Sequence, residues 1–298
     1  DCGITNFEEI KKAKENGFTV IVVDHHQAIG KLPQADIIVD PKQEGETGVF
    51  KDYANAGVTF KLAEEILKEK MSPLLRKSFL ELVALATISD MMPEVEENKE
   101  FIIQGLADIE KSERPAFKSL FSLIKLDNFN SKRDWISKIN SVLNSSKMEG
   151  HTIAVYSFLT ESDYEKAGIM AKELMADSEQ KHREITALTD EIGQRILNGS
   201  LIFDGSPDWN IEYLGAVASR LCNRFERPVF LYQKYEEFSR GTVRVPKGMD
   251  AVKAMENCQE LLVTFGGHPP AAGFTVENKN LERFKQCLLD YFDKKSQS

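Results

Sequence analysis

The chain has 298 residues, of which 42% are hydrophobic and 29% are charged, with 18 glycines and 10 prolines. This composition is typical of a folded protein and excludes disordered, collagen-like and low-complexity chains. The 47 acidic residues outnumber the 38 basic ones, and the net charge of −9 argues against broad, sequence-independent binding of nucleic acid, although it leaves room for a local basic groove. The length favours two domains, each able to bury its own core.

The cysteines indicate a reducing environment. Four are present, at positions 2, 222, 258 and 287, and they form no CxxC pair and no spacing typical of metal ligands. This pattern predicts reduced thiols rather than a disulfide framework or a structural zinc site. No apolar run approaches the roughly 20 residues that cross a bilayer, and no signal peptide is recognisable. We therefore expect a cytoplasmic protein without a membrane anchor.

The first 90 residues alternate between helical and extended patterns. A helix is predicted over 7–16, and the β-branched run 18–23 that follows it is typical of a central parallel strand covered on both faces. A second strand is expected at 36–40, followed by helices at 57–70 and 73–88. The alternation predicts an α/β domain with a parallel sheet.

The remaining residues predict a long helix and a second domain. Residues 110–150 are helical in pattern, with a Ser/Asn-rich patch at 140–147 that is typical of a loop. Residues 162–197 lack proline and repeat apolar residues at spacings of three and four, which predicts one long helix joining two domains. Strands are then expected at 201–203, 228–232 and 241–245, and helices at 214–225, 251–260 and 281–292. Together these form a smaller second α/β unit.

Three polar residues directly follow the first predicted strand. Asp24, His25 and His26 stand where the carboxyl ends of parallel strands face a ligand crevice. Imidazole and carboxylate together suit a borderline metal such as Mn²⁺ or Zn²⁺. The alternative is a capping aspartate with two surface histidines, and an isolated tripeptide of this kind favours that alternative.

Two further aspartates point to the same place. Asp1 lies at the head of the helix that feeds the strand, and Asp90 follows the apolar stretch 80–88, just before Pro93. A charge beyond a buried stretch needs a solvated or metal-bound destination. Carboxylates from separate strand ends could therefore converge on a dinuclear metal site. Asp90 as a simple turn former fits the same pattern equally well.

Candidate phosphate contacts stand near the other end of the chain. Gly266 and Gly267 would let the backbone approach a phosphate closely, and His268 offers a donor to an anionic oxygen. Arg244 points outward from a predicted strand and could bind a phosphate through two hydrogen bonds. The alternatives are an ordinary Gly-Gly turn and a solvated arginine on an edge strand.

Seven segments, in this order, resemble the DHH phosphoesterase superfamily and specifically its RecJ-type single-strand-specific exonucleases. The DHH tripeptide alone is weak evidence, whereas its pairing with a GGHxxAAG segment is specific. The segments cover nearly the whole chain: 1–6, 22–26, 39–42, 56–62, 84–90, 215–221 and 266–273.

The resemblance implies a fold and a set of roles in the first domain. The expected architecture is a DHH domain at 1–160, a connecting helix at 161–198 and a DHH-associated substrate-binding domain at 199–298, with the active site in a cleft between the two domains. The DHH domain would carry two Mn²⁺ or Mg²⁺ ions. Asp1 would bridge the metals, and His25 and Asp90 would be ligands. His26 would contact the scissile phosphate, and Asp24 would orient its neighbours.

In the second domain the resemblance assigns substrate contacts. Arg244 and His268 match the family's phosphate-contacting positions, and Gly266 and Gly267 would shape the loop between them and the substrate. The implied activity is metal-dependent hydrolysis of single-stranded DNA from the 5′ end, in repair or recombination.

Several departures from the family pattern affect this expectation. An Asp-x-Asp-x-x-Gly segment with further metal ligands should precede Asp1 and is absent, so we expect upstream residues to be missing and the metal site to be incomplete. Asn144 stands where the family usually has an arginine, and Asn210 stands in a segment that is usually Trp-His-Pro-Gly. The OB-fold domain of many bacterial members is also absent. Fewer cations weaken anion contact, which favours shorter substrates.

Two alternative functions remain open. One is a nanoRNase or small-nucleotide phosphodiesterase with the same two domains. The other is a catalytically silent scaffold that binds DNA or a replication partner, which the altered Asn144 and Asn210 favour. The acidic residues retained next to the histidines argue against a scaffold, because such residues are costly to keep without a cation.

Overall fold

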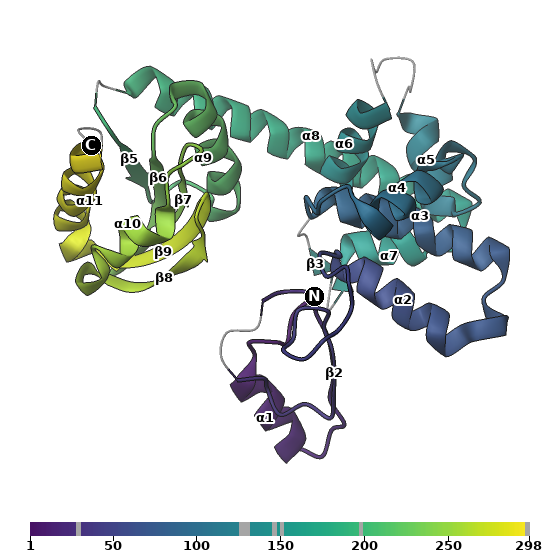
Figure 1. The fold of residues 1–298 in the computed structure, drawn as a ribbon. Helices are drawn as coiled ribbons and strands as arrows, with labels where there is room; N and C mark the ends of the chain where they lie inside the picture. Colours follow the sequence, from purple (N-terminus) through teal and green to yellow (C-terminus); the bar gives the residue numbers. More distant parts are fainter. Residues whose placement is uncertain (28–30, 125–131, 145–147, 150–151, 197–198, 296–298) are drawn as a thin grey trace. The chain divides into compact units, whose positions relative to one another are not determined.

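The computed structural model describes residues 1–27, 31–124, 132–144, 148–149, 152–196 and 199–295. It divides into two compact units, 1–176 and 177–298. Helix α8, Tyr164–Arg195, crosses the boundary between them as one helix of 32 residues (Figure 1). The chain is α/β, with parallel strands in its N-terminal part, this long helix, and a mixed sheet in its C-terminal unit, as the sequence predicts.

The N-terminal unit begins with helix α1, Phe7–Glu15, and two short parallel strands. Strand β1 covers Ile21–Val23 and strand β2 covers Ile37–Val39, and Ile21 pairs with Ile37. The pairing continues for one residue beyond the strands, because the Asp24 N–H donates to the Val39 carbonyl over 3.1 Å. The strand is shorter than the predicted run 18–23, and its end places residue 24 next to the end of β2.

Helices make up most of the rest of this unit. Their bounds are Asn55–Leu67 (α2), Pro73–Ser89 (α3), Glu96–Leu106 (α4), Pro115–Leu123 (α5), Lys132–Leu143 (α6) and Ala154–Thr160 (α7), with 3₁₀ turns at Lys68–Lys70 and Ile109–Lys111. A small antiparallel pair, β3 (Met148–Glu149) and β4 (Thr152–Ile153), precedes α7. The loop predicted at 140–147 is wrong for 140–143, which continue helix α6, while 145–147 lie outside the described residues.

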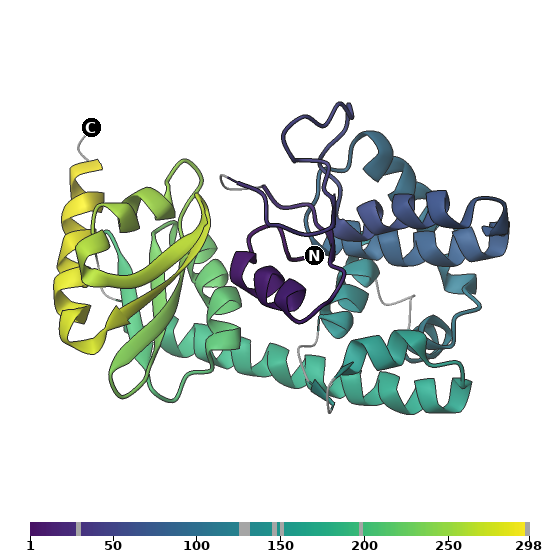
Figure 2. The ribbon, with the colours of Figure 1, turned by 90° about the horizontal axis from the view of Figure 1, so that it is seen from below.

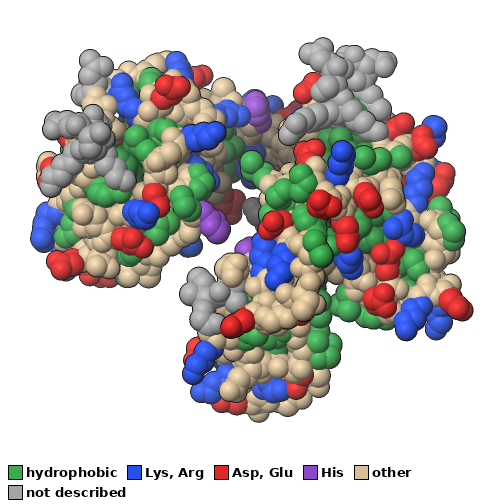
Figure 3. Space-filling view, in the orientation of Figure 1, with side chains coloured by type: hydrophobic (Ala, Val, Ile, Leu, Met, Phe, Trp, Pro, Cys, Tyr) green, Lys and Arg blue, Asp and Glu red, His purple; other side chains and the backbone are tan. Residues whose placement is uncertain are grey.

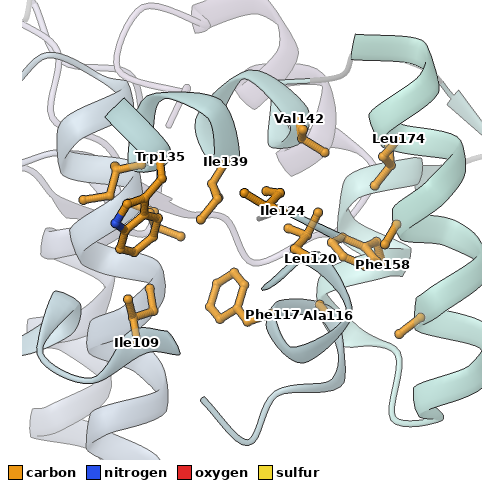
Figure 4. Packing of buried hydrophobic residues seen from close by; sticks show 14 of the residues in the cluster. Ile109, Ala116, Phe117, Leu120, Ile124, Trp135, Ile139, Val142, Phe158 and Leu174 are labelled. Carbon is orange, nitrogen blue, oxygen red and sulfur yellow. The ribbon is translucent and has the colours of Figure 1, made fainter. Parts of the chain in front are cut away.

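Helix α3 is the centre of this unit. The Ser72 hydroxyl accepts from the Leu75 N–H, and Pro73 occupies the first helical position, so both start signals are present. Leu80 and Val83 of α3 pack in one core cluster, with α2 and Phe101. Its later residues join a second cluster with α5 to α8, shown in Figure 4. Helix α3 therefore links the part of the unit that carries the strands to the helical part.

The C-terminal unit is a five-stranded sheet covered on both faces. Its strands, in spatial order, are β5 (Ile202–Ser206), β6 (Val229–Lys234), β7 (Phe238–Arg244), β9 (Ala271–Glu277) and β8 (Leu262–His268); only β5 and β6 run parallel. Its helices are α9 (Ile211–Phe225), α10 (Ala251–Glu256) and α11 (Leu281–Lys295), with 3₁₀ turns at Gln259–Leu261 and Asn278–Asn280.

Alternation along β6 explains the two-sided packing. Val229 and Leu231 join a core cluster with α8 and α9, whereas Phe230 joins a cluster with α10 and α11. Successive strand residues point to opposite faces, and Figure 2 shows the helices on either side of the sheet. The continuous apolar sequence of β6 is the signature of this burial on both faces.

One pair of cysteines corrects the sequence analysis. Cys258 and Cys287 form a disulfide, with their Cα atoms 6.1 Å apart. The prediction of reduced thiols is wrong for this pair because α11 folds back against the end of α10, and a sequence separation of 29 residues carries no local signal. Cys2 and Cys222 are free thiols. Within the described residues, no helix combines the length and hydropathy needed to cross a membrane.

Candidate metal centre

His25 lies buried just beyond the end of β1 with only 3% of its surface exposed. Its Nδ1 is 2.8 Å from the backbone carbonyl oxygen of Tyr53. A carbonyl can only accept a hydrogen bond, so Nδ1 carries the proton and the lone pair of a neutral ring is on Nε2. That nitrogen lies 3.1 Å from Asp1 Oδ1 and 3.5 Å from Asp90 Oδ2.

The surroundings of His25 Nε2 suit a cation. This atom is buried and makes no hydrogen bond with the described residues. A lone pair facing two carboxylate oxygens is repelled unless a proton or a metal ion lies between them. Asp1, His25 and His26 each offer a ligand atom, and these atoms lie within 4.8 Å of one another. The residue types, nitrogen and carboxylate oxygen, fit Mn²⁺ and tolerate Mg²⁺ through the oxygens.

The centre is open on one side. The side chain of Asp1 is 75% exposed and those of His26 and Asp90 are about half exposed, in contrast to the buried His25 ring. The His25 and His26 ring centroids are 4.4 Å apart. A cation held here would keep positions free for solvent or substrate, as catalytic metal sites do.

The Asp24 carboxylate holds this loop together through hydrogen bonds. It is 1% exposed; its Oδ2 accepts from the Ile4 N–H over 3.0 Å, and its Oδ1 accepts from the His25 N–H over 2.8 Å. Oδ1 also lies 2.8 Å from His26 Nδ1. Burial raises the pKa of Asp24, but the hydrogen bonds from Ile4 and His26 outweigh it and lower the pKa to about 2. The carboxylate therefore stays ionised and turns His26 Nε2 outward.

Asp90 follows the helix predicted at 73–88, so its carboxylate comes from a helix end and not from a strand end. It is the C-terminal cap of α3, and its N–H donates to the Ala86 carbonyl over 2.9 Å. The apolar stretch 80–88 is the buried side of that helix. The helix predicted at 73–88 is therefore confirmed, and only the expectation of carboxylates from strand ends is wrong for Asp90. The carboxylate still reaches His25 because α3 terminates beside the end of β1.

A cavity of about 710 Å³ opens beside the centre. Asp1 and Asp90 lie in its wall together with apolar side chains of α2 and α3, among them Phe60 and Phe79. Asn144 lines the same cavity. The position at which this chain departs from the family's arginine thus lines the same cavity as the two carboxylates.

The second group of candidates lies on the C-terminal sheet. Arg244, Ala271 and His268 are register partners across β7, β9 and β8. Arg244 Nη1 donates to Thr242 Oγ1 over 3.0 Å and to the Val243 carbonyl over 2.8 Å. Strand β7 is internal, so the alternative of a solvated arginine on an edge strand is wrong. Burial lowers the pKa of Arg244, and no carboxylate among the described residues forms an ion pair with it.

Gly266 and Gly267 lie in strand β8 rather than in a loop, which corrects the sequence analysis. Gly267 has φ +144°, and a Cβ there would stand 2.5 Å from the Ala271 carbonyl oxygen. The fold itself therefore requires glycine at 267. A Cβ at Gly266 would meet nothing within 4 Å. The fold therefore does not require glycine at 266. The absence of a side chain there leaves room for a ligand above the edge strand β8.

Comparison with known families agrees with this arrangement. The model of the DHH family N-terminal domain matches residues 1–87, and the model of the DHHA1 domain matches residues 198–294. The chain belongs to the DHH family. The metal-centre candidates Asp1 and His25 fall in the DHH match, Asp90 lies three residues beyond its end, and Arg244 and His268 fall in the DHHA1 match.

Relatives of the DHH chain extend over its whole length. The single-stranded-DNA-specific exonuclease RecJ of Bacillus subtilis is 32% identical over 98% of this chain and 38% of the relative, and that of Thermus thermophilus is 30% identical over 98% and 42%. The chain therefore spans less than half the length of these two relatives. A crystal structure of the Thermus thermophilus RecJ in complex with Mn²⁺ superimposes with a TM-score of 0.85 and 26% identity, over 99% of this chain and 44% of that one.

Sequence reasoning missed one important group of this site. The Tyr53 carbonyl, which fixes the His25 ring, is a backbone group, and its role leaves no mark on the residue type. The sequence did single out all five residues that meet around the centre, namely Asp1, Asp24, His25, His26 and Asp90.

Proposed function

We propose that this DHH protein hydrolyses phosphodiester bonds of single-stranded DNA as an exonuclease that digests from the 5′ end with two Mn²⁺ or Mg²⁺ ions. The observation that carries the proposal is the buried His25 Nε2, held toward the carboxylates of Asp1 and Asp90 by the Tyr53 carbonyl. The relatives named for single-stranded DNA support the substrate, and similar structures described with Mn²⁺ and with Mg²⁺ support the ions.

The proposed roles follow from the contacts. Asp1, His25 and Asp90 would hold the cations, and His26 would present Nε2 to the scissile phosphate. Asp24 keeps His26 in that orientation through the 2.8 Å contact to Nδ1. When bound, the cations supply a hydroxide nucleophile and neutralise charge on the phosphate. His26 is the residue that contacts the reacting group, and Asp24 acts through it.

The proposed substrate contacts are on the DHHA1 domain. Arg244, fixed by Thr242 and unpaired with any carboxylate in the described part of the chain, binds one phosphate, and His268 binds another. We keep 1–160, 161–198 and 199–298 as the functional division, in which α8 connects the parts. The cellular role proposed is DNA repair and recombination in the cytoplasm. Cell fractionation tests the location, and recovery of the protein with membranes would contradict it.

Digestion of end-labelled oligonucleotides tests the function. With Mn²⁺ and single strands of 2 to about 60 nucleotides, we expect stepwise loss from the 5′ end of long strands and little loss from duplexes. Turnover restricted to dinucleotides would instead identify a small-nucleotide phosphodiesterase. Asn144 on the cavity wall favours this alternative, because an asparagine lacks the positive charge of the family's arginine. Absence of divalent-cation binding in calorimetry would identify a scaffold.

A further inference from the structure

A second cavity lies in the N-terminal unit on the other side of helix α2. It has a volume of about 730 Å³ and shares no lining residue with the cavity beside Asp1 and Asp90. Its walls come from β2, the segment 40–53, α2 and the start of α4. The size is within the range of small-molecule sites. Neither the metal centre nor the phosphate contacts use it.

The charge of this cavity is strongly negative. Its lining includes one basic residue, Lys61, and five acidic ones: Asp40, Glu46, Glu65, Glu96 and Glu97. Lys61 Nζ contacts Glu97 and lies 5.3 Å from the Tyr53 ring centroid, so this cation is already paired. Among the described residues, no ion pair involves Asp40, Glu65 or Glu96. On the face drawn in Figure 3, basic and acidic side chains of this unit are interspersed.

Asp40 gives an independent indication of a ligand. It is 2% exposed, and its Oδ1 accepts from the Lys42 N–H over 2.8 Å. Its Oδ2 is buried and has no hydrogen-bond partner in the described part of the chain. A buried carboxylate oxygen without a donor is costly, and most such atoms in native proteins are satisfied by protein, water or ligand. Asp40 is part of the lining of the cavity, and an occupant there is the donor that we infer for this oxygen.

The other walls are apolar and aromatic. Phe50 and Tyr53 pack edge to face with ring centroids 4.8 Å apart, and Val58 and Leu62 line the same space. A bare metal ion does not suit such walls. Moreover, a group of three or more acidic, histidine or cysteine side chains close enough to hold a metal ion is found at Asp1, His25 and His26. Among the described residues, no such group lies in this cavity. The mixture of carboxylates and rings suits an organic cation.

We propose that this cavity binds a primary ammonium group carried on an aliphatic chain, with the ammonium at Asp40 and the chain along Phe50, Tyr53 and Val58. An ammonium has three donors and no acceptor, so it satisfies the unpartnered oxygen without leaving a polar atom of its own unpaired. The same chemistry is offered by a free polyamine and by a lysine side chain of a protein partner. The proposal does not depend on the nuclease activity.

Calorimetric titration at constant ionic strength tests this site. Pentylamine is the probe and 1-pentanol its uncharged counterpart, and we expect saturable binding of the amine at least 10-fold tighter than that of the alcohol. Glu65→Gln, an exposed position on α2, should weaken amine binding several-fold, and Asp40→Asn at least 10-fold. Glu8→Gln, an exposed glutamate on α1 outside the cavity, removes the same charge elsewhere and should leave binding unchanged.

Two further ligands distinguish the sources of the ammonium. Tighter binding of spermidine than of Nα-acetyl-lysine methylamide identifies a polyamine site, and the reverse order identifies a lysine-docking site; both support the proposal. Equal affinity for pentylamine and 1-pentanol would overturn it. So would an equal loss of binding in Glu65→Gln and Glu8→Gln, because the charge effect would then be non-specific. Glu65→Gln lies on the surface, so the test remains decisive if Asp40→Asn fails to fold.

Discussion

The backbone carbonyl of Tyr53 accepts a hydrogen bond from His25 Nδ1 over 2.8 Å, and this contact decides which ring nitrogen faces Asp1 and Asp90. Tyr53 lies 28 residues beyond His25, so the loop before α2 is what sets the chemistry of the loop after β1. A metal-binding histidine commonly has its other nitrogen fixed in this way. The protein therefore prepares the ligand before any cation arrives.

The low pKa of Asp24 predicts an acid-sensitive loop. Its pKa is about 2 in the folded chain and near 3.8 when unfolded. A depressed folded pKa means that the stabilisation is present above pH 3.8 and is lost as the pH falls through about 2. Asp24→Asn should lower the free energy of unfolding by roughly 1–3 kcal/mol at pH 7, because it weakens the contacts to Ile4, His25 and His26.

Urea unfolding of Asp24→Asn and the parent protein between pH 2 and 7 measures this effect. The difference between the two should shrink at the acidic end, where the parent also loses its charge. Asp208→Asn, at an exposed aspartate of the C-terminal unit, is the control and should show no such pH-dependent difference from the parent protein. A difference between Asp24→Asn and the parent that stayed constant across the whole range would contradict the assignment.

Arg244 should act through phosphate contact alone. We expect Arg244→Ala to raise KM with little change in kcat, and to reduce the slope of log affinity against log salt by about one. Steady-state kinetics and binding of a fluorescent single strand at several salt concentrations measure both. Arg240→Ala, an exposed arginine on the same strand, is the control. An unchanged salt slope for Arg244→Ala would rule out the phosphate contact.

The two adjacent glycines of β8 should separate fold from function. Gly267→Ala places a Cβ 2.5 Å from the Ala271 carbonyl oxygen at a positive φ, so we expect a loss of about 2 kcal/mol or more in stability. Gly266→Ala meets no neighbour and should leave the melting temperature nearly unchanged while weakening substrate binding. Thermal unfolding and strand binding of both variants check this. Equal stability of the two variants would show that the backbone argument fails.

The disulfide predicts a stability that depends on redox conditions. Closing the loop between Cys258 and Cys287 should stabilise the DHHA1 domain by roughly 3 kcal/mol through the entropy of the unfolded chain. Reduction with dithiothreitol, or Cys287→Ser, should therefore lower its melting temperature. Cys222→Ser, which removes a free thiol, is the control: the melting temperature of this variant should still fall on reduction with dithiothreitol. Mass spectrometry that found both thiols free in oxidised protein would contradict the pairing.

Most helices and strands could be predicted from the sequence, because the residue patterns that specify them lie within a single segment. The β-branched run before Asp24, the helical spacings of α8 and the start signals of α3 each belong to one segment. The helix predicted at 73–88 is one of these elements, and the expectation of the Asp90 carboxylate at a strand end is wrong because the residue follows that helix. It still reached His25, since either kind of terminus can stand beside β1.

Other features could not be predicted because they depend on distant segments. Gly266 and Gly267 read as a turn by composition, and only their pairing with Gly273 and Ala272 makes them a strand. The internal position of β7, which half-buries Arg244, is set by the order of strands in the sheet. The unsatisfied oxygen of Asp40 and the carbonyl of Tyr53 are properties of packing, and residue type alone does not reveal them.

Electron spin-echo measurements on the Mn²⁺-loaded protein test the central claim most directly. With ¹⁵N-histidine labelling, the account predicts a nitrogen coupling to the bound Mn²⁺ that disappears in His25→Ala, together with Mn²⁺ affinity at least about 10-fold weaker and little residual nuclease activity. His182→Ala, which alters an exposed histidine of α8, should retain the coupling. A nitrogen coupling that persisted unchanged in His25→Ala would contradict a cation held between His25, Asp1 and Asp90.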